Sequence, residues 1–164
     1  MAVFQYLAVM IFTGMAMVTD VRTRKIPNWL TVSGFLSGLM FHSFVQGLPG
    51  FQFSLLGFAT GFGLLLILWI IGGGGGGDVK LMGAVGAWLG PTLTLIVFIA
   101  TGFLAPFGQL VMKLRWQSAG TADAITSEKS QNVTSAFRKL PYAVPVAIVV
   151  WTVCSLKLMK YFFQ

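Results

Sequence analysis

The feature that most constrains this chain is a run of six glycines followed directly by an aspartate, with long apolar segments on both sides. It occupies residues 72–80, GGGGGGDVK. Glycine disfavours helix, so a helix that reaches this run is expected to end there. Within a membrane, such a break is tolerated only where protein or water satisfies the freed backbone groups. An ionisable residue at that depth is costly and indicates a functional site, so Asp78 is the first residue that a function must explain.

The overall composition is that of an integral membrane protein. Of the 164 residues, 56% are hydrophobic and 9% are charged, whereas a soluble domain has about 25% charged residues. The net charge of +7 does not indicate a nucleic-acid partner, because the basic residues lie in loops between apolar segments, where they set topology. We therefore expect an all-α polytopic fold in the lipid bilayer, with residues 1–164 forming a single domain of about six transmembrane helices.

The apolar runs predict where these helices lie. They are expected at residues 2–19, 29–46, 51–71, 81–89, 92–112 and from residue 140 onward, with the glycine-rich break before the fourth. The fourth run is too short to cross a bilayer unless the glycine-rich lead-in contributes to it. A polar loop covers residues 113–139. Several glycines inside the runs favour close helix packing; they are Gly34 with Gly38 and Gly57 with Gly61, both pairs at GxxxG spacing, and Gly83 and Gly86.

The basic residues alternate between the loops. The five successive loops contain three, none, one, none and five Lys or Arg residues. The positive-inside rule then places the odd-numbered loops in the cytoplasm and both termini outside. Asp20 and Asp78 are therefore expected at the cytoplasmic ends of two different helices in the inner (cytoplasmic) membrane.

The chain has four acidic residues, and two of them lie at membrane depth. Asp123 and Glu128 belong to the polar loop, which leaves Asp20 and Asp78 as a candidate pair. Two facing carboxyl groups do not both ionise easily, so one of them keeps a proton. Such a pair polarises a water molecule for attack on a peptide carbonyl while protonating the carbonyl oxygen or the leaving amine. The pair therefore predicts the chemistry of an aspartic protease.

Other roles for the two aspartates stay open on spacing alone. Asp20 is also placed to cap a helix end, or to pair with Arg22 or Arg24. Asp78 is also placed to pair with Lys80, or to accept hydrogen bonds from glycine amides. A proton- or cation-coupled transporter would use the same two acids to carry its ion, with the glycine run as a discontinuous helix.

Two regions of the sequence resemble the signature regions of the type IV prepilin peptidases, which are membrane aspartic proteases of the GxGD class. The first is Asp20 with residues 21–28, VRTRKIPN, and the second is residues 75–81, GGGDVKL. A weaker third match is residues 140–145, LPYAVP, which resembles the proline-containing start of the family's last helix. By this resemblance, Asp20 and Asp78 form the catalytic dyad.

The resemblance also implies supporting positions around the dyad. Gly75 and Gly77 are the two glycines of the GxGD motif. Pro27 and Asn28 close the first signature region, and Pro27 is expected near the first turn of the next helix. Lys80 is a hypothetical partner for a glutamate that such substrates often carry shortly after the cleavage point. An ordinary lipid-facing or aspartate-pairing lysine is the alternative.

The implied substrate is a prepilin or pseudopilin precursor, with a short basic leader ahead of an apolar helix, cut at the cytoplasmic membrane face. The dyad activates water, so neither a metal nor another cofactor is expected.

Larger members of the family carry paired CxxC motifs associated with N-methylation. This sequence has one cysteine, Cys154, and resembles the short peptidase-only form of tight-adherence (Flp-type) pilus systems. Archaeal preflagellin peptidases are related alternatives, and a non-catalytic pilus assembly factor would need neither aspartate.

Overall fold

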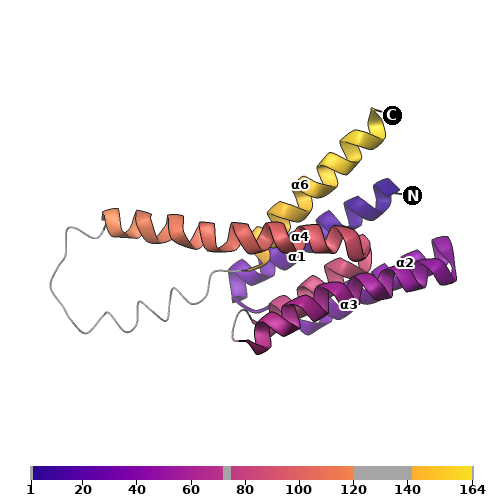
Figure 1. The fold of residues 1–164 in the computed structure, drawn as a ribbon, viewed down its shortest axis with the longest axis horizontal. Coiled ribbons are helices and arrows are strands. Elements are labelled where there is room, and N and C mark those ends of the chain that lie inside the picture. Colours follow the sequence, from indigo (N-terminus) through magenta and orange to yellow (C-terminus); the bar gives the residue numbers. More distant parts are fainter. Residues whose placement is uncertain (1, 72–74, 120–141, 164) are drawn as a thin grey trace.

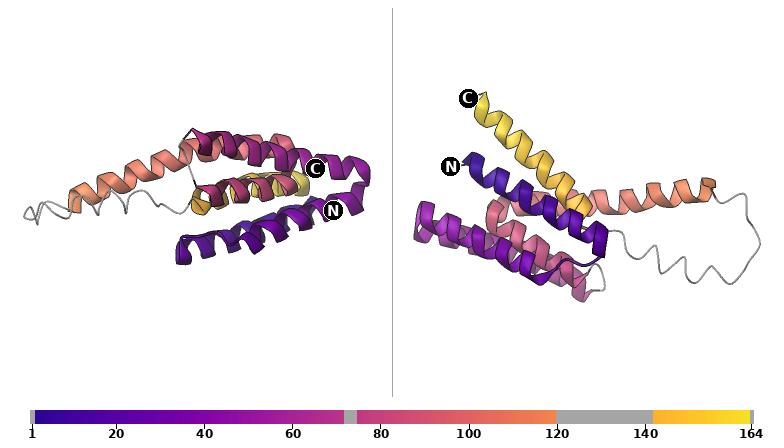
Figure 2. Two further views of the ribbon diagram at one scale, coloured as in Figure 1. Left: turned by 90° about the horizontal axis from the view of Figure 1, so that it is seen from below. Right: turned by 180° about the vertical axis from the view of Figure 1, so that it is seen from behind.

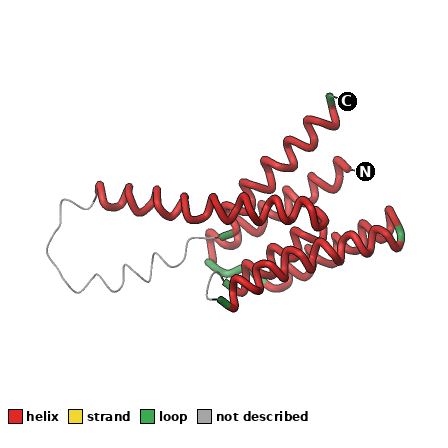
Figure 3. Tube along the Cα trace, viewed as in Figure 1, coloured by secondary structure: helices red, strands yellow, loops and turns green. Residues whose placement is uncertain are grey.

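The computed structural model describes residues 2–71, 75–119 and 142–163 of the chain, and all regular secondary structure in these ranges is helical. The helices are α1 (Ala2–Thr23), α2 (Asn28–Gln46), α3 (Leu48–Ile70), α4 (Gly76–Ala119) and α6 (Ala143–Phe162). Figure 1 shows them as a bundle, and Figure 3 shows how short the described connections between α1, α2 and α3 are. The predicted all-α class is confirmed.

Within the described residues, four segments are long and apolar enough to cross a membrane: Val3–Thr23, Leu48–Ile70, Gly76–Leu104 and Ala143–Tyr161. These spans support a polytopic membrane protein. They do not support the predicted count of six crossings in the described part of the chain. The difference has two physical reasons: the expected fourth and fifth helices fall within one segment, and the 19 residues of α2 include polar side chains such as Asn28, His42 and Gln46.

The segment Gly76–Leu104 is a helical hairpin folded at Gly90. The backbone of Gly90 has φ 75° and ψ 175°, a conformation that side-chain-bearing residues rarely adopt. Pro91 then starts the second arm, where its missing N–H costs nothing. Thr94 Oγ1 donates to the Gly90 carbonyl at 2.6 Å, and Ser54 Oγ donates to a carbonyl of the preceding turn, that of Ala87, at 2.8 Å. Figures 1 and 2 show the second arm running back across the bundle.

Several helix boundaries differ from those that the sequence predicts. α4 begins at Gly76, inside the glycine run, instead of at residue 81. It also continues to Ala119, because residues 109–119 contain neither glycine nor proline to stop it. The predicted polar loop therefore starts later than residue 113, and residues 120–139 lie outside the described part of the chain. α1 extends through Thr23, which places Asp20 inside its last turn.

The first arm of α4 is the centre of the bundle, since residues 81–90 are all buried. It contacts α3 through glycines. A Cβ atom added to Gly57 would lie 2.1 Å from the Gly86 carbonyl oxygen, and one added to Gly61 would lie 2.4 Å from the Met82 carbonyl oxygen. Backbones can approach this closely only where both surfaces lack side chains. The predicted packing role of Gly57, Gly61 and Gly86 is confirmed.

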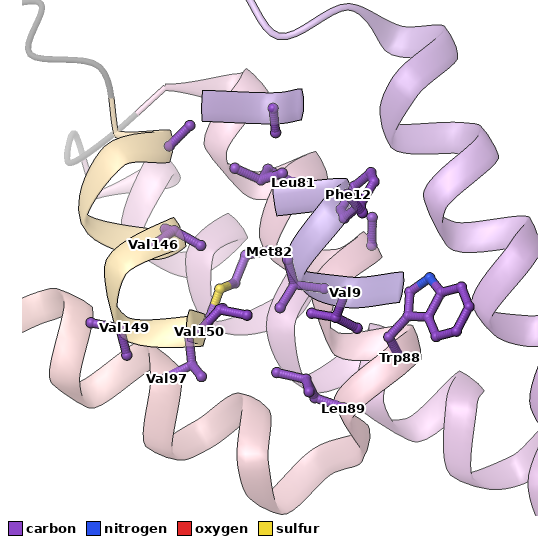
Figure 4. Packing of buried hydrophobic residues seen from close by; sticks show 14 of the residues in the cluster. Val9, Phe12, Leu81, Met82, Trp88, Leu89, Val97, Val146, Val149 and Val150 are labelled. Atoms are coloured by element: carbon purple, nitrogen blue, oxygen red, sulfur yellow. The ribbon is translucent and has the colours of Figure 1, made fainter. Parts of the chain in front are cut away.

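The glycines of α2 receive aromatic rings from neighbouring helices. A Cβ atom on Gly34 would lie 2.3 Å from the Phe12 ring of α1, and one on Gly38 would lie 2.9 Å from the Trp88 ring of α4. The Trp88 indole N–H also donates to the Gly34 carbonyl at 2.9 Å. Figure 4 shows Leu81, Met82 and Leu89 of α4 packed among apolar residues of α1 and α6. Every helix of the described bundle contributes to this core.

The bundle has two distinct ends. Both termini and the turn between α2 and α3 lie at one end, whereas α1 and α3 finish, and α2, α4 and α6 begin, at the other (Figures 1 and 2). We call the second of these the motif end, because it holds the residues 20–28 and 75–81 that carry the resemblance. The two signature regions are thus brought together by the fold.

Candidate active site

Asp20 lies at the motif end and is held by a helix far away in sequence. Its side chain is buried, with 7% of its surface exposed. Its Oδ2 atom accepts a hydrogen bond of 3.1 Å from the backbone N–H of Ala143, the first residue of α6. The first N–H groups of a helix lack partners within the helix, and the helix dipole favours negative charge there. The carboxylate of Asp20 therefore caps α6.

The connection that follows Asp20 is a compact turn. Arg24 has a positive φ of 52°, and its N–H donates to the backbone carbonyl of Asp20 at 2.8 Å, which closes the C-terminal end of α1. Pro27 has φ −68° and ψ 139°, and it is the N-cap residue of α2, which starts at Asn28. The predicted role of Pro27 at the start of the second helix is confirmed.

Asp78 lies in the first turn of α4 and is half-buried. Its Oδ2 atom accepts the backbone N–H of Gly75 at 2.9 Å, while the Gly75 carbonyl accepts the N–H groups of Asp78 at 3.0 Å and Val79 at 3.3 Å. This is one half of a capping box, in which the side chain of the third helical residue reaches back to the N–H of the cap residue. The sequence left open that Asp78 accepts a hydrogen bond from a glycine amide, and the structure contains this bond. The bond holds the Asp78 carboxyl group at the start of α4.

The two carboxyl groups and a tyrosine form one electrostatic group. Asp20 lies close enough to Asp78 for its charge to act on that carboxyl group. Tyr142, which lies just before the membrane-spanning part of α6, has its pKa raised to about 12, by burial and then by the charge of Asp78. Asp20, Asp78 and Tyr142 come from α1, α4 and the residue that precedes α6, so three separate elements converge at the motif end.

The two signature regions also touch through Lys80. Its Nζ atom donates to Oδ1 of Asn28 at 3.0 Å. Lys80 is exposed, and this bond joins the first residue of α2 to the first turns of α4. In the described part of the chain, Lys80 therefore bonds to Asn28 and not to Asp78. This disfavours the alternative in which Lys80 pairs with Asp78.

The two motif glycines have different surroundings. A Cβ atom on Gly75 would lie 3.1 Å from Oδ2 of Asp78, which is tighter than nine in ten real Cβ contacts. A Cβ atom on Gly77 would lie 3.6 Å from the Cβ of Ile26, an ordinary van der Waals distance. The structure therefore gives a steric reason for glycine at 75 and none at 77.

The sequence interpretation missed two participants, Tyr142 and the backbone N–H of Ala143. Both belong to the LPYAVP segment, where the prolines drew attention to a helix start but not to its polar contacts. Among the described residues, no group of three or more His, Cys, Asp or Glu side chains is placed to hold a metal ion. The chemical resources of this site are two carboxyl groups, one phenol and two helix N-termini.

A family model for the type IV leader peptidase family matches residues 7–108, which is more than half of the chain. The chain belongs to the type IV leader peptidase family. The matched range contains both signature regions, and so it includes Asp20 and Asp78, whereas Tyr142 lies beyond it. Membership in this family supports a leader peptidase role in general terms. No curated protein and no solved structure matches the chain.

Proposed function

We propose that this leader peptidase is an aspartic endopeptidase whose dyad is Asp20 and Asp78. It removes the short basic leader from prepilin or pseudopilin precursors at the cytoplasmic face of the membrane. The observation that carries the proposal is that Asp20, in the last turn of α1, and Asp78, in the first turn of α4, belong to the same end of the bundle, where the charge of Asp20 acts on Asp78. Methyl transfer is not part of the proposal.

The chemistry follows from a pair that shares one proton. The ionised carboxylate takes a proton from a water molecule as the water oxygen attacks the scissile carbonyl carbon, and the protonated carboxyl group donates to the carbonyl oxygen. The tetrahedral intermediate then breaks its C–N bond, and the proton taken from water passes to the leaving amine. As the C–N bond breaks and the C=O bond forms again, a hydroxyl proton of the intermediate returns to the second carboxylate, which restores the original protonation state of the pair.

The contacts of the dyad suit this chemistry because each carboxyl group is held in place by a backbone N–H. Asp20 is fixed by the N–H of Ala143 and Asp78 by the N–H of Gly75, each at a helix N-terminus that offsets negative charge. Pre-oriented groups of this kind avoid the free-energy cost of reorganisation during the reaction. The half-buried position of Asp78 leaves it the more accessible of the two to an extended substrate.

Lys80 supplies the proposed contact to the substrate. It is exposed and oriented by Asn28, and so is able to meet a glutamate carboxylate that follows the cleavage point. The variant Lys80→Gln keeps a donor for Asn28 but removes the charge. It should slow cleavage of a precursor that has this glutamate, and equal rates for Lys80→Gln and the wild type would contradict the contact.

The experiment that tests the dyad is a gel-shift assay of candidate precursors co-expressed with the wild type, Asp20→Asn or Asp78→Asn. Asp123→Asn is a matched control, because it makes the same chemical change at an acid of the polar loop. Both dyad variants should lose cleavage at normal membrane levels, while the control keeps it. Cleavage by either variant would remove that aspartate from catalysis.

Two other outcomes would favour other functions. If precursors are processed normally when both aspartates are replaced, a non-catalytic assembly factor is favoured. If the protein carries an ion flux that Asp78→Asn abolishes, a transporter is favoured.

A further inference from the structure

The connection between α1 and α2, residues 24–27, lies against the start of α4, and contacts hold it there at two points. The Ile26 side chain lies over the bare backbone of Gly77: a Cβ atom on Gly77 would be 3.6 Å from the Ile26 Cβ. About one turn further along α4, Nζ of Lys80 donates to Oδ1 of Asn28, the first residue of α2, at 3.0 Å. Gly77 and Lys80 are three residues apart and therefore share one face of α4. We call these two contacts the clamp.

The clamp joins the two segments that carry the aspartates. Asp20 lies in the last turn of α1, shortly before the connection, and Asp78 lies between the two clamp contacts along α4. The connection is braced by its own hydrogen bonds. The N–H of Arg24 donates to the carbonyl of Asp20 at 2.8 Å. The Thr23 hydroxyl donates to the carbonyl of Lys25 at 2.9 Å. Because the connection is braced, a shift at the clamp would change the position of Asp20 relative to Asp78.

The other contacts at the start of α4 are local or apolar. A Cβ atom on Gly76 would meet nothing within 4 Å. The N–H and carbonyl of Gly75 bond to Asp78 and Val79, within the same turn of helix. Val79 packs in the core, and apolar contacts are not directional. Within residues 75–80, the described hydrogen bond to another helix is the one of the clamp, and hydrogen bonds are directional. The clamp is therefore suited to orient the first turn of α4.

We propose that Ile26 and Asn28 are positioning residues for the dyad. Through the clamp they set the position of Asp78 relative to Asp20, and the clamp stays closed while the peptide bond is cut. Neither residue touches the reacting atoms. This inference rests on the proposed function, because a positioning role has meaning only if the two aspartates are catalytic. It gives Asn28 a role that is separate from orienting Lys80 toward a substrate glutamate.

The kinetic test uses purified full-length protein with Asn28→Leu, which keeps a side chain of similar size but cannot accept a hydrogen bond. Gln46→Leu is a matched control, because it removes an exposed amide from the other end of the same helix. The synthetic precursor has its glutamate replaced by glutamine, so that a lost contact between Lys80 and the substrate does not contribute. We expect Asn28→Leu to lower kcat about 2- to 10-fold, the effect of one hydrogen bond, with a smaller change in KM. Equal kcat values for Asn28→Leu and the wild type would overturn the inference.

A covalent form of the clamp tests whether it stays closed. The distance of 3.6 Å between the Cβ positions of residues 26 and 77 is typical of disulfides. Ile26→Cys with Gly77→Cys should therefore form a disulfide under mild oxidation, seen after denaturation as the loss of two free thiols, with the native Cys154 as internal reference. The oxidised protein should cleave at least as fast as the same protein after reduction, and oxidation should restore the kcat lost with Asn28→Leu. Activity lost on oxidation and regained on reduction would overturn the inference.

The rate of disulfide formation does not depend on cleavage, so it separates the clamp from the proposed function. Asn28→Leu should slow this rate, because Lys80 no longer holds the start of α2 against α4. Equal rates with and without Asn28→Leu would overturn the inference, even if the cysteine variants cleave poorly. A normal disulfide together with cleavage by Asp20→Asn or Asp78→Asn protein would contradict the proposed function. The clamp contacts would then stand, but their positioning role would be lost.

Discussion

At the scale of single residues, Gly75 and Gly76 are neighbours in the glycine run that differ in the space available for a side chain. A methyl group on Gly75 would crowd Oδ2 of Asp78 at 3.1 Å, whereas one on Gly76 would meet nothing within 4 Å. We expect Gly75→Ala to displace the Asp78 carboxylate from the Gly75 N–H and to slow cleavage several-fold. Alanine is also a poorer N-cap than glycine, by about 0.5 to 1 kcal/mol of stability. Gly76→Ala should be close to wild type.

The measurement is the initial rate of precursor cleavage for both alanine variants, with thermal unfolding in detergent to separate stability from activity. Gly77→Ala extends the comparison, because its Cβ would make an ordinary contact with Ile26. Equal loss of activity in Gly75→Ala and Gly76→Ala would mean that backbone freedom, and not the fit around Asp78, is what the glycine run provides.

At the scale of helices, the contact between α3 and α4 depends on the absence of side chains. A Cβ atom on Gly86 would lie 2.2 Å from the Gly57 carbonyl oxygen, and that oxygen belongs to a rigid helix. Gly86→Ala should therefore separate the two helices and lower stability by about 1 to 3 kcal/mol, the usual cost of overpacking. The start of α4, with Asp78, would shift as well, so cleavage should fall.

The matched control for this prediction is Gly63→Ala on α3, whose Cβ would meet nothing within 4 Å. Because alanine favours helix over glycine, Gly63→Ala should leave stability unchanged or raise it by up to about 1 kcal/mol. Chemical or thermal unfolding of both variants in the same detergent provides the comparison. Similar unfolding curves for Gly86→Ala and Gly63→Ala would contradict the close α3–α4 contact.

Local features of the helices were predictable from sequence, and their long-range contacts were not. The glycine break, the start of α2 near Pro27 and the packing role of Gly57 and Gly61 follow from backbone preferences within a few residues. The bond from Ala143 to Asp20 joins groups 123 positions apart, and a backbone N–H leaves no mark in a sequence. The break at Gly90 follows from glycine followed by proline, but the direction in which the second arm of the hairpin runs does not.

At the scale of the whole molecule, the fold collects its polar chemistry at one end and leaves apolar side chains on its flanks. Phe4, Ile11, Leu56 and Ile99, from three different helices, are each about half exposed or more. Such surfaces suit a lipid environment, in which exposed apolar groups incur no hydration cost. The motif end, with the exposed cations Arg22, Arg24, Lys25 and Lys80, is the end expected to meet the cytoplasm.

This orientation is open to a labelling experiment, because the described chain has one cysteine, Cys154, and it is buried. New cysteines are placed at exposed positions on opposite ends, as Lys25→Cys at the motif end and Gln46→Cys beside the α2–α3 turn. A membrane-impermeant maleimide applied to spheroplasts should label Gln46→Cys at once and label Lys25→Cys only after lysis. The unaltered protein measures background from Cys154. The reverse pattern would place the aspartates outside the cell, where the basic leader of a precursor, held inside by its charge, could not reach them.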